Sequence, residues 1–253
     1  MNNQKENNFL NKNQKVLYQV SLLQGLTYGD YKGSVTIKEL KEHGDIGIGT
    51  FDKLNGELIM VDGVVYRALG NGSVEVVFDN ETVPFAMVTY MTLDESKNLQ
   101  KIADYETLCD ELNKIVKEKG VNRFYFVRID GTFNEINVRS VYAQKEPYKR
   151  LVEVMDCDQT FFDYKNIEGT LVGLYCPPFM AGINAVGWHL HFISKDKRSG
   201  GHLLGLNIAN AKLTLNGIDG FEIRLPQNKE FQMFDFSTDQ SEDIKKIETN
   251  KSH

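Results

Sequence analysis

The stretch that decides the fold reads Gly187-Trp188-His189-Leu190-His191-Phe192-Ile193-Ser194, and after a polar segment it continues as Gly201-His202-Leu203-Leu204. Because side chains two apart in a strand point to the same face, His189 and His191 share one face, with Leu190 and Phe192 on the other. The segment 195–201 is charged and ends in Gly-Gly, which predicts a turn into a second strand. A hairpin centred near Asp196 and Lys197 places His202 opposite His191.

Three imidazoles that meet on one patch predict a metal site with one open position, which is typical of catalytic zinc. A single buried histidine is more often only hydrogen-bonded, and a solvated surface cluster is a second alternative. The third histidine in register and the apolar neighbours of the motif favour a buried metal site. Copper, nickel and iron also accept imidazole ligands, so zinc is a preference.

The composition excludes some classes of protein. With 253 residues, 41% of them hydrophobic and 25% charged, the chain can bury the core of one large domain or two small ones. A net charge of -6 argues against nucleic acid as a partner. The three cysteines are widely spaced, and we find neither a signal peptide nor an apolar run of membrane-spanning length. These features predict a cytoplasmic protein that does not bind membranes.

The remaining pattern indicates a mixed α+β protein. The ranges 46–51, 57–61 and 64–68, with tight turns between them, predict an antiparallel meander. An apolar stripe at helical spacing predicts a helix over 105–119, and Pro147 is expected in the first turn of another. Strands at 125–129 and 133–142 are expected around a turn at Asp130-Gly131. A short helical pattern runs through Ile244, Ile247 and Glu248 near the C-terminus.

Two polar features in these strands have more than one interpretation. Glu57 opens a strand, where a carboxylate is either an exposed strand end or a placed acid, and the pattern alone favours the exposed end. Glu135, Asn137 and Arg139 share one face of a strand. Such a face is either solvated or lines a polar pocket, and the sequence does not decide between them.

Several motifs together resemble the α-acetolactate decarboxylase family. They are His43-Gly44-Asp45-Ile46-Gly47-Ile48-Gly49-Thr50-Phe51, Gly56-Glu57-Leu58 with Asp62-Gly63, Glu168-Gly169-Thr170-Leu171-Val172-Gly173, Gly182-Ile183-Asn184, and the histidine motifs ending at Gly200-Gly201-His202. The resemblance extends roughly from Leu17 to Glu248. It implies a two-lobed, homodimeric mixed-sheet fold with flanking helices and an antiparallel hairpin that carries the metal. On this chain we expect an N-terminal mixed-sheet lobe (16–145) and a C-terminal lobe with the hairpin and a C-terminal tail (146–253), and the polar composition of residues 1–15 predicts a flexible tail.

The resemblance also implies an activity. Members of the family are carboxy-lyases of acetoin biosynthesis that convert (S)-2-acetolactate, a small anionic 2-hydroxy-3-keto acid, to (R)-acetoin and CO2. They use zinc and no thiamine diphosphate, and zinc acts as the Lewis acid that stabilises the enediolate. The family's zinc ligands match His189, His191 and His202. Its catalytic residues match Glu57, Arg139 and Glu248, of which Arg139 also binds the substrate carboxylate, and Thr50 is a second substrate-binding position. Either glutamate is a candidate proton donor.

Other classes of protein remain as alternatives. A non-catalytic module that binds a metal or a small ligand on a related fold predicts bound metal without release of CO2. A zinc hydrolase uses the open position for hydroxide, but no His-Glu-x-x-His helix is present. Cupins also carry His-x-His strands, but the glutamate that usually follows as a ligand is missing between Ile193 and Gly201.

Overall fold

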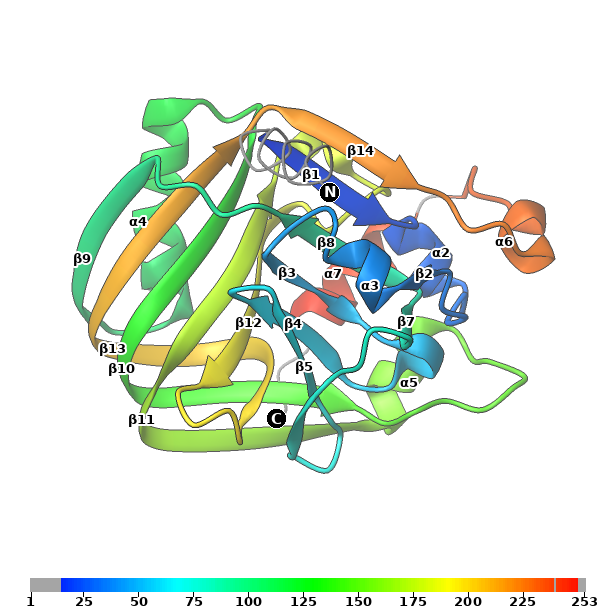
Figure 1. The fold of residues 1–253 in the computed structure, drawn as a ribbon, viewed down its shortest axis with the longest axis horizontal. Coiled ribbons are helices and arrows are strands. Elements are labelled where there is room, and N and C mark those ends of the chain that lie inside the picture. The colour runs from blue at the N-terminus through cyan, green and yellow to red at the C-terminus, as the bar shows by residue number, and fades with distance from the viewer. Residues whose placement is uncertain (1–14, 239, 250–253) are drawn as a thin grey trace, which may run out of the picture.

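The computed structural model describes residues 15–238 and 240–249, in which the chain forms two large β-sheets with short helices around them (Figure 1). The first sheet has seven strands in the order β14 (Gly220–Arg224), β1 (Val16–Val20), β8 (Phe85–Thr89), β3 (Ile46–Thr50), β4 (Glu57–Val61), β5 (Val64–Ala68) and β6 (Val74–Val76). The second has five: β10 (Phe124–Val141), β11 (Gln159–Cys176), β12 (Gly187–Ser194), β13 (Gly200–Ile218) and β9 (Glu95–Ile102). A small third sheet pairs β2 (Val35–Thr36) with β7 (Thr82–Val83). The α+β class is therefore confirmed.

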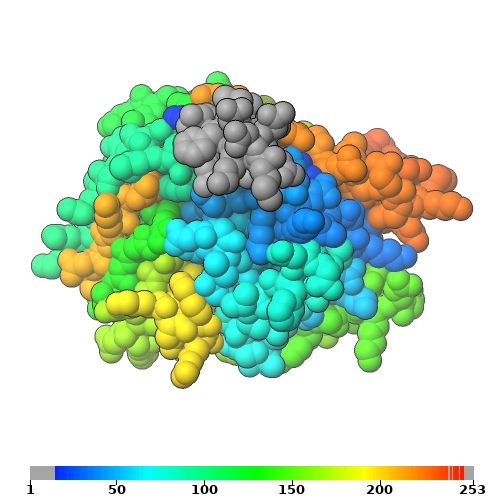
Figure 2. Space-filling view, viewed as in Figure 1, coloured from blue at the N-terminus to red at the C-terminus, as the bar shows by residue number. Residues whose placement is uncertain are grey.

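The helices are mostly short and lie around the sheets. They are α2 (Leu23–Thr27), α3 (Ile37–Leu40), α4 (Tyr105–Lys119), α5 (Leu151–Cys157), α6 (Lys229–Met233) and α7 (Ser241–Thr249), with 3-10 turns η1 (Asp52–Leu54) and η2 (Pro178–Met180). In the space-filling view the segment that carries α6 projects from the right-hand side of the molecule (Figure 2). No helix in the described part of the chain is long and apolar enough to cross a membrane.

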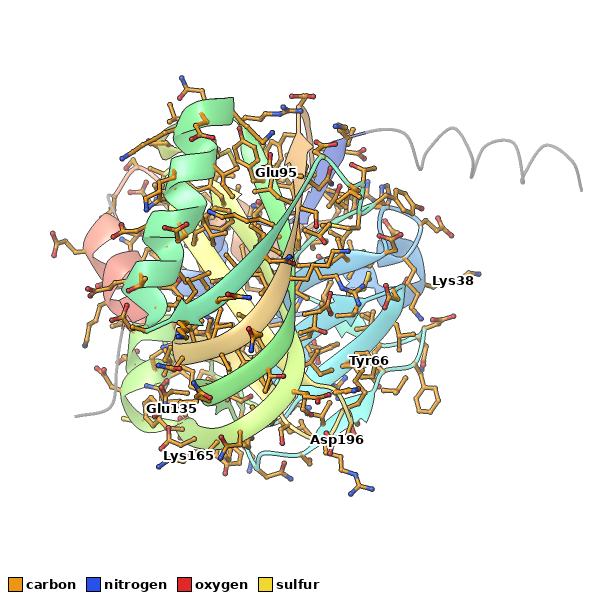
Figure 3. All side chains as sticks on the ribbon, turned by 90° about the vertical axis from the view of Figure 1, so that its left-hand side faces the viewer. Lys38, Tyr66, Glu95, Glu135, Lys165 and Asp196 are labelled. Atoms are coloured by element: carbon orange, nitrogen blue, oxygen red, sulfur yellow. The ribbon has the colours of Figure 1, made fainter. Side chains whose placement is uncertain are left out.

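Three apolar clusters cover the faces of the two sheets, one between the sheets and one on the outer face of each. The first lies between the sheets and contains Ile48 and Ile59 from one and Val172 and Ile193 from the other. The second contains the apolar stripe of α4, which lies across the outer face of the second sheet (Figure 3). The third covers the outer face of the first sheet. Both sheets thus bury both faces over much of their area, so any site between them is withdrawn from solvent.

Helix α4 agrees with its prediction, whereas α5 begins later than expected. The Asp104 carboxylate accepts a hydrogen bond from the Thr107 amide at 2.7 Å and caps α4. Pro147, expected in the first turn of a helix, precedes α5, which begins at Leu151. The carboxylate of Glu153 accepts a hydrogen bond from the backbone amide of Arg150 at 2.9 Å. This bond satisfies a backbone N–H group at the start of α5.

The predicted turn at Asp130-Gly131 is wrong, because both residues lie inside the single long strand β10. Gly131 pairs with Gly169 on one side and with Ala211 on the other. A Cβ atom at Gly131 would lie 2.3 Å from the backbone oxygen of Asn210. The glycine therefore permits close approach of neighbouring strands and does not form a turn.

The sheets do not follow the two lobes expected from the sequence, with their boundary between residues 145 and 146. Strands β9 and β10 precede this boundary but pair with strands that follow it. Strand β14 follows the boundary but pairs in parallel with β1, with Val16 beside Gly220. Strand pairing therefore crosses the expected boundary, and the division into two lobes stays a prediction. The expected tail at 1–15 lies, except for Lys15, outside the described residues.

Candidate metal centre

The pairing of three neighbouring strands places Arg139, His202 and His191 in one row. His202 on β13 pairs with His191 on β12 and with Arg139 on β10. Directly paired residues of adjacent strands point to the same face. The predicted register of the hairpin, with His202 opposite His191, is confirmed. The row also shows why an arginine more than 50 residues upstream belongs to the same site.

The three imidazoles converge closely. Nε2 of His189 lies 3.1 Å from Nε2 of His191 and 3.1 Å from Nδ1 of His202. Taking one ring nitrogen from each histidine, the three nitrogens all lie within 4.8 Å of one another. Two nitrogens bound tetrahedrally to zinc at about 2.0–2.1 Å would be roughly 3.3 Å apart. The donor set therefore fits a small divalent cation.

A hydrogen bond between the sheets orients His191 for this role. Its Nδ1 lies 2.9 Å from the backbone oxygen of Leu58 on β4. Because a carbonyl oxygen only accepts, Nδ1 carries the hydrogen, and Nε2 of a neutral ring presents a lone pair to the other two imidazoles. Metal-binding histidines typically have such a partner behind the ring.

The electrostatic surroundings keep His189 and His191 neutral. Burial, with a smaller effect of the Arg139 charge, lowers the pKa of His189 to about 3. Burial, followed by the neighbouring His189, also holds the pKa of His191 well below its usual value. Neutral imidazole is the form that binds a metal, because both nitrogens of the cation are protonated.

Glu57 and Thr50 approach the histidines from the first sheet. They pair directly with each other on β4 and β3. The expectation of an exposed strand end at Glu57 is wrong, since the residue is only 8% exposed and lies between β3 and β5 in the interior of the sheet. Its Oε2 is 3.6 Å from Nε2 of His191. The hydroxyl of Thr50 donates to the backbone oxygen of Gly56 at 2.8 Å.

The polar face of β10 divides between surface and interior. Glu135 is exposed and is labelled in Figure 3, whereas Arg139 is only 2% exposed. The pairing of β10 with β13 shifts register between Asn137 and Val138, which marks a bulge between the two environments. Nη1 of Arg139 lies 3.5 Å from Oε1 of Gln159.

A small cavity joins these groups. Its volume is about 50 Å³, which is room for a few water molecules. Thr50, Glu57, Arg139 and the three histidines line its polar side. The rest of the lining is mainly apolar: Leu23, Leu26, Leu54, Phe85, Val141, Leu151, Met155 and Ile247. The sequence does not single out this apolar part, because its residues have the same pattern as ordinary core residues.

Glu248 belongs to α7, whose presence confirms the short helical pattern seen near the C-terminus. The side chain of Glu248 lies outside the described part of the structure. Its assignment as a catalytic residue stays a prediction. Ile247, one residue before it, does line the cavity.

Comparisons with known proteins agree with the family resemblance. The model of the family described as alpha-acetolactate decarboxylase matches residues 17–238. The alpha-acetolactate decarboxylase of Methanosarcina mazei is 38% identical over 233 residues, which cover 92% of this chain and 80% of that protein. The Bacillus subtilis protein of the same name is 35% identical over 235 residues, covering 93% and 90%.

Solved structures show the same fold. The crystal structure of alpha-acetolactate decarboxylase from Bacillus subtilis strain 168 has a TM-score of 0.89 at 34% identity, covering 92% of this chain and 99% of that one. A Staphylococcus aureus protein, described as of unknown function and similar to alpha-acetolactate decarboxylase, has a TM-score of 0.85 at 31% identity, covering 92% and 99%.

Proposed function

The chain belongs to the alpha-acetolactate decarboxylase family of carboxy-lyases, and from this premise we propose that it converts (S)-2-acetolactate to (R)-acetoin and CO2 at a zinc centre held by His189, His191 and His202. The observation that carries the proposal is one cavity lined by three imidazoles, a buried arginine and a buried glutamate. These groups come from four strands, β4, β10, β12 and β13, and core packing alone does not account for their meeting at one cavity.

The three histidines fit a divalent cation, and the choice of zinc rests on the imidazole donor set and its spacing. When bound, the cation supplies a Lewis acid for the negative charge that develops on oxygen as CO2 leaves. The protein's part is to hold the imidazoles neutral and oriented. Such a centre takes the place of an organic electron sink, so no thiamine diphosphate is needed.

Arg139 binds the substrate carboxylate. Its planar guanidinium can donate two parallel hydrogen bonds to a carboxylate, which a lysine cannot do. At a position only 2% exposed, a charge-assisted contact of this kind contributes about 1.5–3 kcal/mol. Arg139 lies in one row with His202 and His191, which supports a pose in which the carboxylate contacts Arg139 and the ketone and hydroxyl oxygens face the histidines.

Glu57 donates the proton to the carbon that CO2 has left. The departing CO2 leaves its electron pair on that carbon, and the pair is shared with the ketone oxygen as an enediolate. Proton delivery from one face then sets the configuration of acetoin. Glu57 lies on the first sheet and the histidines on the second, so the acid approaches from a single side. Thr50 lines the same wall and contributes to substrate binding, while Glu248 stays the second candidate for the acid.

Homodimer formation, a cytoplasmic location and a place in acetoin biosynthesis accompany this proposal as predictions from the sequence. Size-exclusion chromatography with light scattering tests the first of these directly.

A coupled assay tests the function. Purified protein is incubated with racemic acetolactate, and CO2 and the enantiomers of acetoin are measured before and after chelation and again after zinc is restored. We expect release of CO2 with (R)-acetoin, loss on chelation and recovery with zinc. Stoichiometric zinc without release of CO2 would favour the non-catalytic binding module. Full activity of a protein with no bound metal would contradict the metal-dependent mechanism.

A further inference from the structure

The cavity is divided into a polar and an apolar side, and the apolar side comes largely from helices. Leu23 lies on α2, Met155 on α5 and Ile247 on α7, whereas the histidines and Arg139 lie on strands. Helix α5 packs against both α2 and α7. A substrate whose oxygens face the strands therefore has only its carbon substituents left to face the helices.

Met155 is an apolar lining residue that is linked through Gln159 to the carboxylate-binding arginine. The side chain of Gln159 donates from Nε2 to the backbone oxygen of Met155, and its Oε1 faces Nη1 of Arg139 at 3.5 Å. The carbon of a 2-hydroxy-3-keto acid that bears the carboxylate also bears the alkyl substituent. A carboxylate on Arg139 thus brings that substituent toward α5.

Ile247 lies in the same apolar cluster as Met155. Charged contacts also join α7 to α5 and to the residue before it. Nη2 of Arg150 lies 3.1 Å from Oδ2 of Asp243, and Nζ of Lys246 lies 2.9 Å from Oδ2 of Asp156. Ile244 and Ile247 of α7 join the same apolar cluster as Leu151 and Met155. Ile247 is 4% exposed and Met155 6%, so neither can turn out to solvent without disturbing the packing.

We propose that Met155, supported by Ile247, is the specificity-determining wall that limits the alkyl substituent at C2 of the substrate. The inference rests on the proposed decarboxylase function. Because Met155 and Ile247 are packed in the core and line a small cavity, each methylene added to the substituent has to displace one of these side chains. In apolar pockets one methylene typically changes kcat/KM by about 10- to 200-fold.

The test compares acetolactate with its homologue that carries an ethyl group at C2, in the zinc-loaded full-length protein. The quantity measured is the ratio of kcat/KM for the methyl substrate to that for the ethyl substrate. Met155→Ala and Ile247→Ala are expected to lower this ratio about tenfold or more, chiefly by raising kcat/KM for the ethyl substrate. Met60→Ala is the matched control, because Met60 is fully buried on the opposite face of the first sheet and does not line the cavity.

The outcomes separate the inference from the function on which it rests. Wild-type protein that releases CO2 from acetolactate, with a ratio unchanged in both cavity variants, overturns the inference and leaves the function intact. An equal change in the Met60→Ala control also overturns it, because the effect would then reflect general loosening. Wild-type protein inactive on both substrates overturns the function and the inference together. If an alanine variant fails to fold, Met155→Val and Ile247→Val remove less volume and test the same change in the ratio.

Discussion

At the scale of single residues, chemistry-bearing side chains were easier to predict than their surroundings. The alternation of His189 and His191 with apolar neighbours and the short polar turn before His202 were sufficient for the correct register. The burial of Glu57 was not predictable from its own strand. A residue at a strand end becomes buried only when a second sheet covers it, and that sheet begins far along the chain.

Replacement of Glu57 by glutamine tests its role as proton donor. The amide keeps the size of the side chain but cannot deliver the proton, so we expect kcat to fall by about 10²- to 10⁴-fold. Zinc content, measured by atomic emission, should stay near that of the wild type because Glu57 is not among the three proposed ligands. Glu135→Gln, at an exposed position on β10, is the control. Near-normal turnover of a zinc-loaded Glu57→Gln protein would assign the acid to another residue.

Arg139 offers a second test, in which charge and shape are separated. Arg139→Ala removes the charge-assisted contact of about 1.5–3 kcal/mol, so kcat/KM for acetolactate should fall roughly 10- to 150-fold. Arg139→Lys keeps the charge but not the planar fork, and we expect only partial recovery. Inhibition by a neutral analogue such as acetoin should change little in either variant. Equal weakening of the charged and the neutral ligand would indicate a collapsed cavity and not a lost carboxylate contact.

At the scale of secondary-structure elements, the sequence identified most segments but divided the longest strands. Asp130-Gly131 has the composition of a tight turn, yet its neighbours on both sides pair with it in register. Local turn propensity was overridden by pairing with residues about 40 and 80 positions later in the chain. Glycine serves turns and close strand approach equally well, and only knowledge of the neighbouring strands separates the two uses.

Gly131→Ala tests this interpretation of β10. The added methyl group would lie 2.3 Å from the oxygen of Asn210 and must displace the backbone of β13. We expect the free energy of unfolding to fall by about 1–3 kcal/mol, measured by urea denaturation. Thr132→Ala, at the next and exposed position, should change it by less than about 0.5 kcal/mol. Equal stability of the two variants would show that β10 and β13 can separate at Gly131 at little cost in free energy.

At the scale of the whole molecule, the site exists because two sheets close on each other. Strands β12 and β13 of the second sheet contact β4 of the first, and the His191–Leu58 hydrogen bond crosses this interface. The sequence could not predict this arrangement of the sheets, since β14 returns to pair with β1 about 200 residues earlier. Pairings of that separation leave no local trace in composition or periodicity.

Metal binding should consequently stabilise the whole molecule and not only the hairpin. A ligand that binds the folded state alone adds about 2.7 kcal/mol to the free energy of unfolding at a free concentration 100 times its Kd. We expect zinc to raise the denaturation midpoint of the wild-type protein and chelation to lower it. The variant with His189, His191 and His202 all changed to alanine should show no response to zinc.

Because the histidines lie on the second sheet while Leu58 and Glu57 lie on the first, both sheets should gain protection from amide hydrogen exchange together. Protection confined to β12 and β13 would mean that the cation stabilises only the hairpin and not the contact between the two sheets. The acid on β4 could then move away from the reacting carbon.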